Sequence, residues 1–418
     1  MIPPLTTSWR LGRWALPAAL TLLTACVTPT PTPPPAAVPE KPAGPLVEVP
    51  PDEWPLMLDD LDAASLVEAC NQSLTYLRRV PPERMFNYGP HQRSAVAVAS
   101  GLERLRDILV RVPDPAQRRE ILQRDFILLA SRGSDDQGRV LMTGYYEPVL
   151  PGRRQPQPPF VHPLYGLPDD LINYSLRELC EEHVDRLKMD CSQLPSTRLV
   201  GRTEKHRLEK YYDRAAIDYQ EVLRDKAEVL AYVDNLVEQF FLHIQGSGLV
   251  VFPDGQRVRL GYLASNGRPY RAIGKELIRR GLLTRDQMSM QRIKQILDAH
   301  PQLRQEVLAE NPSYVFFREL PAEGGPPGAL GVPVTAGRSI AVDRALFPDA
   351  GAAFIVGTRP APGGQAVDFS RFVLAQDTGG AIKGPGRLDL FFGSGDQAGE
   401  LAGRMKHEGR LYFLAPRR

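Results

Sequence analysis

Hydrophobic residues recur at spacings of three and four from residue 56 to about residue 131, a period that predicts α-helices. The pattern is clearest in AASLVEACNQSLTYLRRV and in AVAVASGLERLRDILVRV. A third stretch, DPAQRREILQRDFILLASRG, opens with Asp114 and Pro115, a helix-start signal, and runs to Gly133. We therefore expect a helical region in the N-terminal part of the folded chain.

From Val140 onward, short apolar runs alternate with turns that contain glycine and proline, which is typical of β-strands. The runs are VLMTGYYEPVL, GLVVFPDGQRVRLGYLA, SYVFFREL, SIAVDRALFP, AAFIVG, FVLAQDTG, LDLFFG and RLYFLA. Helical periodicity returns around 224–245 and 286–310. Many short strands favour β-barrels over a doubly wound sheet, so we expect a mainly β protein with an N-terminal helical region.

The first 25 residues have the pattern of a secretory signal peptide. Arg10 and Arg13 precede an apolar run that is too short to span a bilayer. The following LTAC, which ends at Cys26, is similar to a bacterial lipobox, in which the cysteine becomes the lipidated first residue. The alternative is an ordinary signal peptide followed by an unrelated cysteine. Because Val27 replaces the aspartate that marks retention at the inner membrane, the similarity implies an outer-membrane lipoprotein that faces the periplasm.

Residues 26–55 are rich in proline, so we expect an extended tether without a core of its own. The whole chain has 418 residues, enough for two or three domains, with the hydrophobic content of a soluble globular protein. A formal net charge of +2 argues against a nucleic-acid partner, because such proteins carry a strong basic bias.

Three cysteines remain after Cys26. Cys180 and Cys191 are close enough in sequence to pair, although the sequence leaves their pairing open, and an odd number leaves at least one thiol free. The chain contains no CxxC or HExxH pattern, and its seven histidines show no metal-ligand spacing. We expect no metal and no cofactor.

The stretch DTGGAIKGPGRLDLFFG, residues 377–393, contains two candidate catalytic acids. Asp389 lies on a predicted strand, where it shares a face with Arg387 and Phe391. If Phe391 walls a cleft, desolvation raises the pKa of the Asp389 carboxyl, as a general acid requires at neutral pH. The alternative is a structural acid that pairs with Arg387 or with a backbone amide.

The other acids of this region have a supporting role in our interpretation. Asp377 precedes a Thr-Gly-Gly turn, where an aspartate commonly accepts hydrogen bonds from backbone amides, which lowers its pKa. Asp343, at the end of a predicted strand, is also interpreted as structural. Lys383, the cation of the glycine-rich run, is grouped with these supporting residues.

Asp-Thr-Gly is also the mark of aspartic proteases, in which two such aspartates share a proton. The chain has only one Asp-Thr-Gly, which excludes a two-lobed protease. A homodimeric protease fits poorly because the polar Gln376 precedes the aspartate and a glycine-rich run follows it.

Two further stretches have the composition of a sugar-binding cleft. MTGYYEPVL, residues 142–150, contains Thr143, Tyr145 and Tyr146, and tyrosine rings can stack on a sugar while hydroxyls bond its edge. QGSG, residues 245–248, supplies Gln245 and Ser247 as partners for hydroxyl and acetamido groups. The alternatives are an edge strand whose tyrosines close a core, and a hairpin with glycine turns.

Four stretches, in the same order along the chain, resemble the membrane-bound lytic murein transglycosylase A family: MTGYYEP, QGSG...SNGRPYRAIG, NPSYVFFRE and SIAVDRALFP...DTGGAIKGPGRLDLFFG. The resemblance extends from about residue 60 to the C-terminus. It implies a double-psi β-barrel, built from residues 56–147 and 321–418, with a second β-barrel inserted between them at residues 148–320. The substrate cleft would lie between the two barrels.

The resemblance also assigns roles. Asp343, Asp377 and Asp389 match three aspartates of the family's C-terminal domain, and Asp389 matches the one that performs the chemistry. The residues implied to line the sugar subsites are Thr143, Tyr145, Tyr146, Gln245 and Ser247. Two features depart from the family pattern: the spacer 385–387, and segment 174–195, which matches no family motif.

The function implied by the resemblance is cleavage of the β-1,4 bond between N-acetylmuramic acid and N-acetylglucosamine, with formation of a 1,6-anhydromuramyl end. The partners are then peptidoglycan glycan strands and, through the lipid, a membrane. Two alternatives differ in their chemistry: a non-catalytic envelope lipoprotein that binds peptidoglycan, and a hydrolase that uses Asp389 with a second carboxylate.

Overall fold

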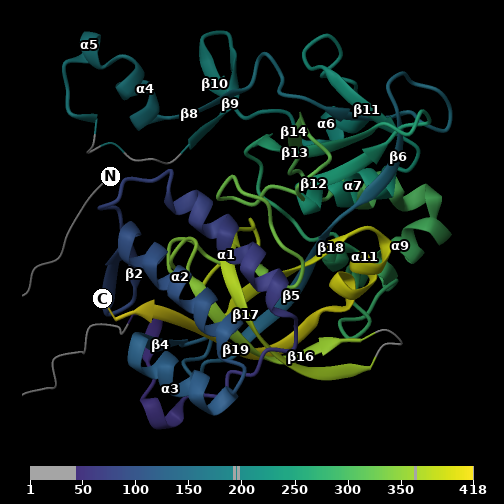
Figure 1. Cartoon of the computed structure of the whole chain (residues 1–418). Helices are drawn as coiled ribbons and strands as arrows, with labels where there is room; N and C mark the ends of the chain where they lie inside the picture. Colours follow the sequence, from purple (N-terminus) through teal and green to yellow (C-terminus); the bar gives the residue numbers. More distant parts are fainter. Residues whose placement is uncertain (1–43, 192–193, 195–197, 362–364, 418) are drawn as a thin grey trace, which may run out of the picture. The chain divides into compact units, whose positions relative to one another are not determined.

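The computed structural model describes residues 44–191, 194, 198–361 and 365–417. The predicted signal peptide and Cys26 lie outside these residues. Within the part that is described, no helix is long and apolar enough to cross a membrane. The protein is mainly β, with helices beside its sheets (Figure 1).

The larger sheet has eight strands in the order β1-β4-β19-β16-β17-β15-β18-β5. Its strands are β1 (Leu46–Glu48), β4 (Phe126–Ser131), β5 (Val140–Glu147), β15 (Ser339–Ala341), β16 (Ala352–Pro360), β17 (Ala366–Asp377), β18 (Arg387–Ser394) and β19 (Lys406–Pro416). Strand β5 pairs with β19 as well as with β18, so six of the strands form a closed ring of pairings. Closure leaves these six strands without a free edge.

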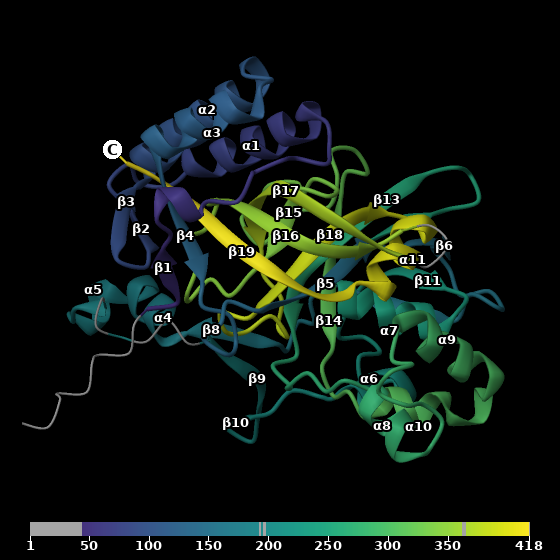
Figure 2. The same ribbon diagram turned by 90° about the horizontal axis from the view of Figure 1, so that it is seen from below.

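Three helices cover one side of this sheet (Figure 2): α1 (Ala63–Leu77), α2 (Ala95–Arg111) and α3 (Pro115–Asp125). Each begins at a residue whose side chain caps the first turn, namely Asp62, Ser94 and Asp114. Pro115 follows its cap at the first helical position, as the sequence predicted. The apolar faces of α1 and α2 join the main core with the inner residues of the strands.

The helical prediction for residues 56–131 was too broad. A hairpin of β2 (Met85–Tyr88) and β3 (His91–Ser94) separates α1 from α2. The helix α3 ends at Asp125, and the run FILLAS that follows is strand β4. This run is apolar throughout, so its period does not distinguish a helix from a buried strand.

The tether was also predicted to extend too far along the chain. Residues 46–48 form strand β1, which pairs with β4, and a 3-10 turn follows at η1 (Pro51–Glu53). Leu46 and Trp54 are buried in the main core, so the folded body already includes them.

A second sheet of six strands has the order β14-β13-β12-β6-β11-β7. Its strands are β6 (Val149–Arg153), β7 (His162–Tyr165), β11 (Val229–Val233), β12 (Ser247–Val251), β13 (Arg257–Ser265) and β14 (Val315–Leu320). Its helices are α6 (Arg214–Tyr219), α7 (Leu236–Gln245), α8 (Gly274–Arg279), α9 (Met290–Ala299) and α10 (Arg304–Ala309), with the 3-10 turn η3 (Pro301–Leu303). The predicted helix at 224–245 is therefore wrong in its first half, which contains β11.

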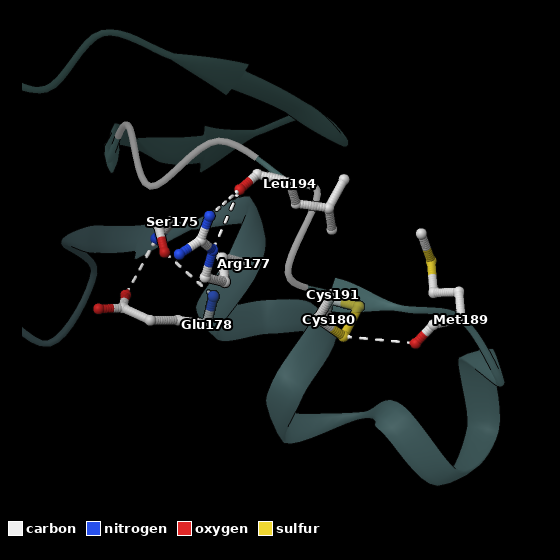
Figure 3. Close-up of a disulfide and its surroundings, with 7 residues drawn as sticks. All are labelled: Ser175, Arg177, Glu178, Cys180, Met189, Cys191 and Leu194. Carbon is white, nitrogen blue, oxygen red and sulfur yellow. Dashed lines mark hydrogen bonds between the residues drawn. A yellow bond between two sulfur atoms is a disulfide. The ribbon is translucent and has the colours of Figure 1, made fainter. Parts of the chain in front are cut away.

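Residues 172–209 form a small lobe with a three-stranded sheet of β8 (Ile172–Ser175), β9 (Arg198–Glu204) and β10 (Arg207–Glu209). Between β8 and β9 lie α4 (Leu176–Glu182) and α5 (Val184–Leu187). A disulfide joins Cys180 to Cys191, and Ser175 and Glu178 form a capping box at the start of α4 (Figure 3). Cys70 is a free cysteine buried in the main core.

Candidate active site

The two aspartates of the 377–393 stretch lie in one row across four neighbouring strands. Asp389 of β18 pairs with Thr143 of β5 on one side and with Ala341 of β15 on the other. Ala341 also pairs with Asp377 of β17. Because neighbouring strands are about 4.8 Å apart, the backbones of the two aspartates are separated by about 10 Å. Residues opposite one another share a face of the sheet, so this row places the acids on the same side.

The Asp389 side chain is half-buried, and its Oδ1 is buried without a hydrogen-bond partner among the described residues. Desolvation raises the pKa of this carboxyl to about 7, although the Thr143 hydroxyl and the Arg387 cation lower it. Asp377 adds a small repulsion that raises it further. At neutral pH a substantial fraction of Asp389 is therefore protonated and able to donate a proton.

An aromatic pair stands beside Asp389. The rings of Tyr145 and Phe391 are 5.1 Å apart between centroids, and these two residues pair across β5 and β18. Phe391 is two positions from Asp389 on the same face of β18, as the sequence predicted, and is buried. This pair contributes the apolar surroundings that desolvate the acid.

Asp377 accepts three hydrogen bonds. Its Oδ2 accepts one from the Tyr145 hydroxyl at 2.8 Å, and its Oδ1 accepts two from the backbone N–H groups of Thr378 and Ala329 at 2.8 and 2.9 Å. The amide contact to Thr378 was predicted, but the predicted consequence was wrong. Burial outweighs the hydrogen bonds and raises the pKa of Asp377 above its usual value.

Asp343 fixes the glycine-rich loop between β17 and β18. Its buried carboxylate accepts a hydrogen bond from the Gly384 N–H at 2.9 Å, where the φ of +83° favours glycine. At Gly386 a Cβ would lie 2.5 Å from the backbone nitrogen of Ser134, so only glycine fits. Lys383 lies exposed in the same loop.

The remaining predicted residues separate into two groups. Thr143 and Tyr145 lie beside Asp389 and Asp377, as described above. Tyr146 points elsewhere: it is 5% exposed and packs against Ala398 and Ala402 of α11 (Asp396–Arg404). Its ring is part of a core and is not available as a sugar platform.

Gln245 and Ser247 lie where the second sheet meets β5. The Gln245 side-chain oxygen accepts a hydrogen bond from the Tyr146 N–H at 3.1 Å, and Ser247 pairs with Gly261 of β13. Gln245 thus holds the backbone of the strand that carries Thr143 and Tyr145. Asn266, in the SNGRPYRAIG stretch, is buried and forms hydrogen bonds only with the backbone of neighbouring loops.

A buried ion pair at the end of β5 was not predicted from the sequence. Glu147 accepts hydrogen bonds from Arg259 at 2.6 Å and from the Ser394 hydroxyl at 2.6 Å. It therefore connects β13 of the second sheet with β5 and β18 of the first. The signal in the sequence was the acid in GYYEP, which is unusual at the end of an apolar strand.

No cluster that could hold a metal ion, of three or more His, Cys, Asp or Glu side chains, occurs in the described part of the chain. The site is thus a carboxylic acid with a raised pKa, beside a threonine hydroxyl and an aromatic wall. Such a site can donate a proton to a leaving oxygen and then accept one back.

Two family models match this chain. The model of the MltA specific insert domain matches residues 141–318, and the model of the 3D domain matches residues 338–415. Among named relatives, membrane-bound lytic murein transglycosylase A of Vibrio cholerae is 35% identical over 288 residues, 68% of this chain and 67% of that protein. The Escherichia coli K12 protein of the same name is 34% identical over 294 residues, 68% of this chain and 67% of that protein.

Solved structures agree with these matches. The membrane-bound lytic murein transglycosylase from Agrobacterium tumefaciens has a TM-score of 0.70 and 33% identity, and the match covers 89% of this chain and 98% of that one. The structure of Escherichia coli MltA with bound chitohexaose has a TM-score of 0.67 and 27% identity, with coverages of 90% and 95%.

Proposed function

The chain belongs to the membrane-bound lytic murein transglycosylase A family, and from this premise we propose that Asp389 is the single residue that carries out its chemistry. The chain is a lytic murein transglycosylase, an enzyme that acts on peptidoglycan in the cell envelope. The chitohexaose bound to the Escherichia coli protein supports a glycan strand as substrate.

The proposed reaction breaks the β-1,4 bond between N-acetylmuramic acid and N-acetylglucosamine. Protonated Asp389 donates its proton to the glycosidic oxygen while the bond from that oxygen to the muramyl C1 breaks. The resulting carboxylate then takes the proton from the muramyl C6 hydroxyl as the C6 oxygen bonds to C1. The products are a free N-acetylglucosamine hydroxyl and a 1,6-anhydromuramyl end, and Asp389 is again protonated.

One acid is sufficient because the nucleophile is part of the bound sugar. Ordinary glycosidases use two carboxylates, since one of them must activate water or attack the sugar. An intramolecular hydroxyl that is held in place can supply about 7–11 kcal/mol of the barrier. Asp377 is engaged by Tyr145 and two amides, and it supports the loop without taking a proton from the substrate.

Thr143 and Tyr145 are proposed to contact the sugar next to the broken bond, because they share the face of Asp389. Gln245 and Ser247 are proposed to border the cleft on the side of the second sheet. Asp343 and Lys383 belong to the proposed supporting loop. Tyr146 is left out of the proposed site because its ring is buried.

The finer architecture is also a proposal. The closed ring of six strands is consistent with a double-psi β-barrel from 56–147 and 321–418, and the second sheet is consistent with an inserted barrel at 148–320. Lipidation of Cys26 after removal of residues 1–25 would anchor the enzyme at the outer membrane, facing the periplasm.

The observation that carries this proposal is the carboxyl of Asp389, with its buried, unpartnered Oδ1 and a pKa of about 7. The test is to incubate the protein lacking residues 1–26 with purified sacculi and to identify the products by mass spectrometry. We expect anhydromuropeptides, lighter by one water than hydrolysed ones, and their loss in Asp389→Asn. Hydrated products would indicate a hydrolase, and binding without products would favour the non-catalytic lipoprotein.

A further inference from the structure

A pocket of about 690 Å³ lies between the 172–209 lobe and the loop that follows β13. Its volume is within the usual range of ligand pockets. It is lined by Arg198, Leu199, Val200, Leu208, Lys210, Asp213, Asn266, Gly267, Arg268, Pro269, Arg271 and Pro312. Asp389, Thr143, Tyr145, Gln245 and Ser247 do not line this pocket, so the proposed chemistry leaves it unexplained.

The pocket has a fixed base. Gly267 has a φ of +69°, and a Cβ there would lie 2.6 Å from the Cβ of Val200 in β9, so the lobe packs directly on the loop. Asn266 donates hydrogen bonds to the backbone oxygens of Tyr212 and Pro312 at 2.9 and 2.8 Å. These contacts fix the loop that follows β13 against the backbone at Tyr212 and Pro312.

The charge of the lining is strongly positive, with four cations and one acid. The acid, Asp213, caps α6 by accepting a hydrogen bond from the Ala216 N–H. Arg198 is engaged within the lobe by Glu178 and Asn173. Lys210 and Arg271 are exposed, and neither forms a salt bridge with an acid of the described chain. Arg268 donates a hydrogen bond from its Nε to the Tyr211 backbone oxygen. Lys210 and Arg271 are thus the two lining cations available for an anionic ligand.

Apolar side chains complete the walls. Leu199 and Leu208 are 38% and 51% exposed, although both are large hydrophobic residues. Pro269 and Pro312 also line the pocket. The lining therefore matches a short ligand that carries carboxylates together with small apolar groups.

We propose that this pocket binds the stem peptide of peptidoglycan, which is attached to muramic acid and carries free carboxylates and alanine methyl groups. This inference rests on the proposed function, because that function brings peptide-bearing strands to the enzyme. Gly261 pairs with Ser247, and the pocket loop begins at Asn266, directly after the end of the same strand. The pocket thus lies about 15 Å along β13 from the proposed cleft border. A peptide held there improves the binding of the strand and leaves the chemical step unchanged.

The first test compares glycan strands that carry stem peptides with strands from which an amidase has removed the peptides. We expect wild-type protein to prefer peptide-bearing strands in kcat/KM by about tenfold, the effect of one charge-assisted hydrogen bond, mainly through KM. The double variant Lys210→Gln/Arg271→Gln should lose this preference and keep its activity on bare strands. Lys205→Gln is the matched control, because Lys205 is an exposed cation of the same lobe that does not line the pocket.

The second test separates this inference from the reaction. The free tetrapeptide L-alanyl-D-glutamyl-diaminopimelyl-D-alanine has no glycosidic bond, so its binding can be measured by calorimetry whether or not the protein cleaves strands. We expect binding to wild-type protein and to Lys205→Gln, and loss of binding in the double variant.

Absence of peptide binding, or equal binding by all three proteins, would overturn the inference. Charge-dependent binding to phosphatidylglycerol vesicles without peptide binding would overturn it in favour of a membrane contact. Peptide binding by a protein that forms no anhydro ends would instead contradict the proposed function.

Discussion

Asp377 and Asp389 lie on opposite sides of Ala341, which is the pairing partner of both aspartates. One acid is engaged by three hydrogen bonds, while the other has an oxygen without a partner. Burial raises the pKa of both, but hydrogen bonds engage both oxygens of Asp377 and leave Oδ1 of Asp389 unpartnered among the described residues. The division of roles follows from the hydrogen bonds and not from a difference in burial.

Activity should fall as the pH rises through about 7, because the pKa of Asp389 is about 7 and only the protonated acid can donate. Arg387 lowers this pKa, so Arg387→Gln should move the alkaline limb of the kcat/KM profile to higher pH. The measurement is the pH dependence of anhydromuropeptide release. An alkaline limb at the same pH in both proteins would rule out Asp389 as the group that titrates.

Asp389→Asn should abolish product formation, with a loss of about 10²–10⁴-fold or more.

The same variant, Asp389→Asn, should be more stable than wild type at pH 8. Folding raises the pKa of the Asp389 carboxyl from near 4 to about 7. The wild-type protein therefore loses stability as the pH rises through this range, because the buried carboxyl must ionise. The gain at pH 8 is on the order of 1–3 kcal/mol, and it should vanish near pH 3. Urea unfolding at the two pH values measures it.

Tyr145→Phe should destabilise the protein by about 1–2 kcal/mol, because Asp377 then loses a hydrogen bond in a desolvated site. The matched control is Tyr146→Phe, since the Tyr146 hydroxyl forms no hydrogen bond with the described residues while its ring packs against α11. Thermal unfolding of the two variants provides the comparison. Equal melting temperatures would show that the Tyr145–Asp377 contact contributes nothing.

Gly386→Ala should displace the loop between β17 and β18 and reduce activity. The added methyl would lie 2.5 Å from the Ser134 nitrogen, which costs about 1–3 kcal/mol of overpacking. Gly380→Ala is the control, because nothing lies within 4 Å of a Cβ at that position. We expect kcat on sacculi to fall in the first variant and not in the second. Equal activity in both would mean that the loop does not position Asp389.

The sequence predicted those elements whose signals were local. The Asp114–Pro115 helix start and the strand position of Asp389 depend on neighbouring residues alone, and the structure has both. The run at 126–131 failed because an unbroken apolar segment has no period, and it became a strand by pairing with β19 far along the chain.

The candidate site also depends on contacts that local sequence signals do not predict. Adjacent tyrosines on a strand point to opposite faces, and nothing local indicates that Tyr145 faces the acids while Tyr146 faces α11. The pKa of Asp377 was misjudged for a related reason: the amide next to it is visible in the sequence, whereas its burial depends on segments that are distant in the chain.

The arrangement of the three described cysteines has a consequence for disulfide formation. Cys180 and Cys191 are already close in the lobe, whereas burial raises the pKa of the Cys70 thiol to about 12 and keeps it unreactive. Thiol–disulfide exchange needs a thiolate, so Cys70 cannot compete once the main core has formed. If the core folds first, Cys180 and Cys191 are the only two of the described cysteines that can still pair, so a wrong pair with Cys70 does not form.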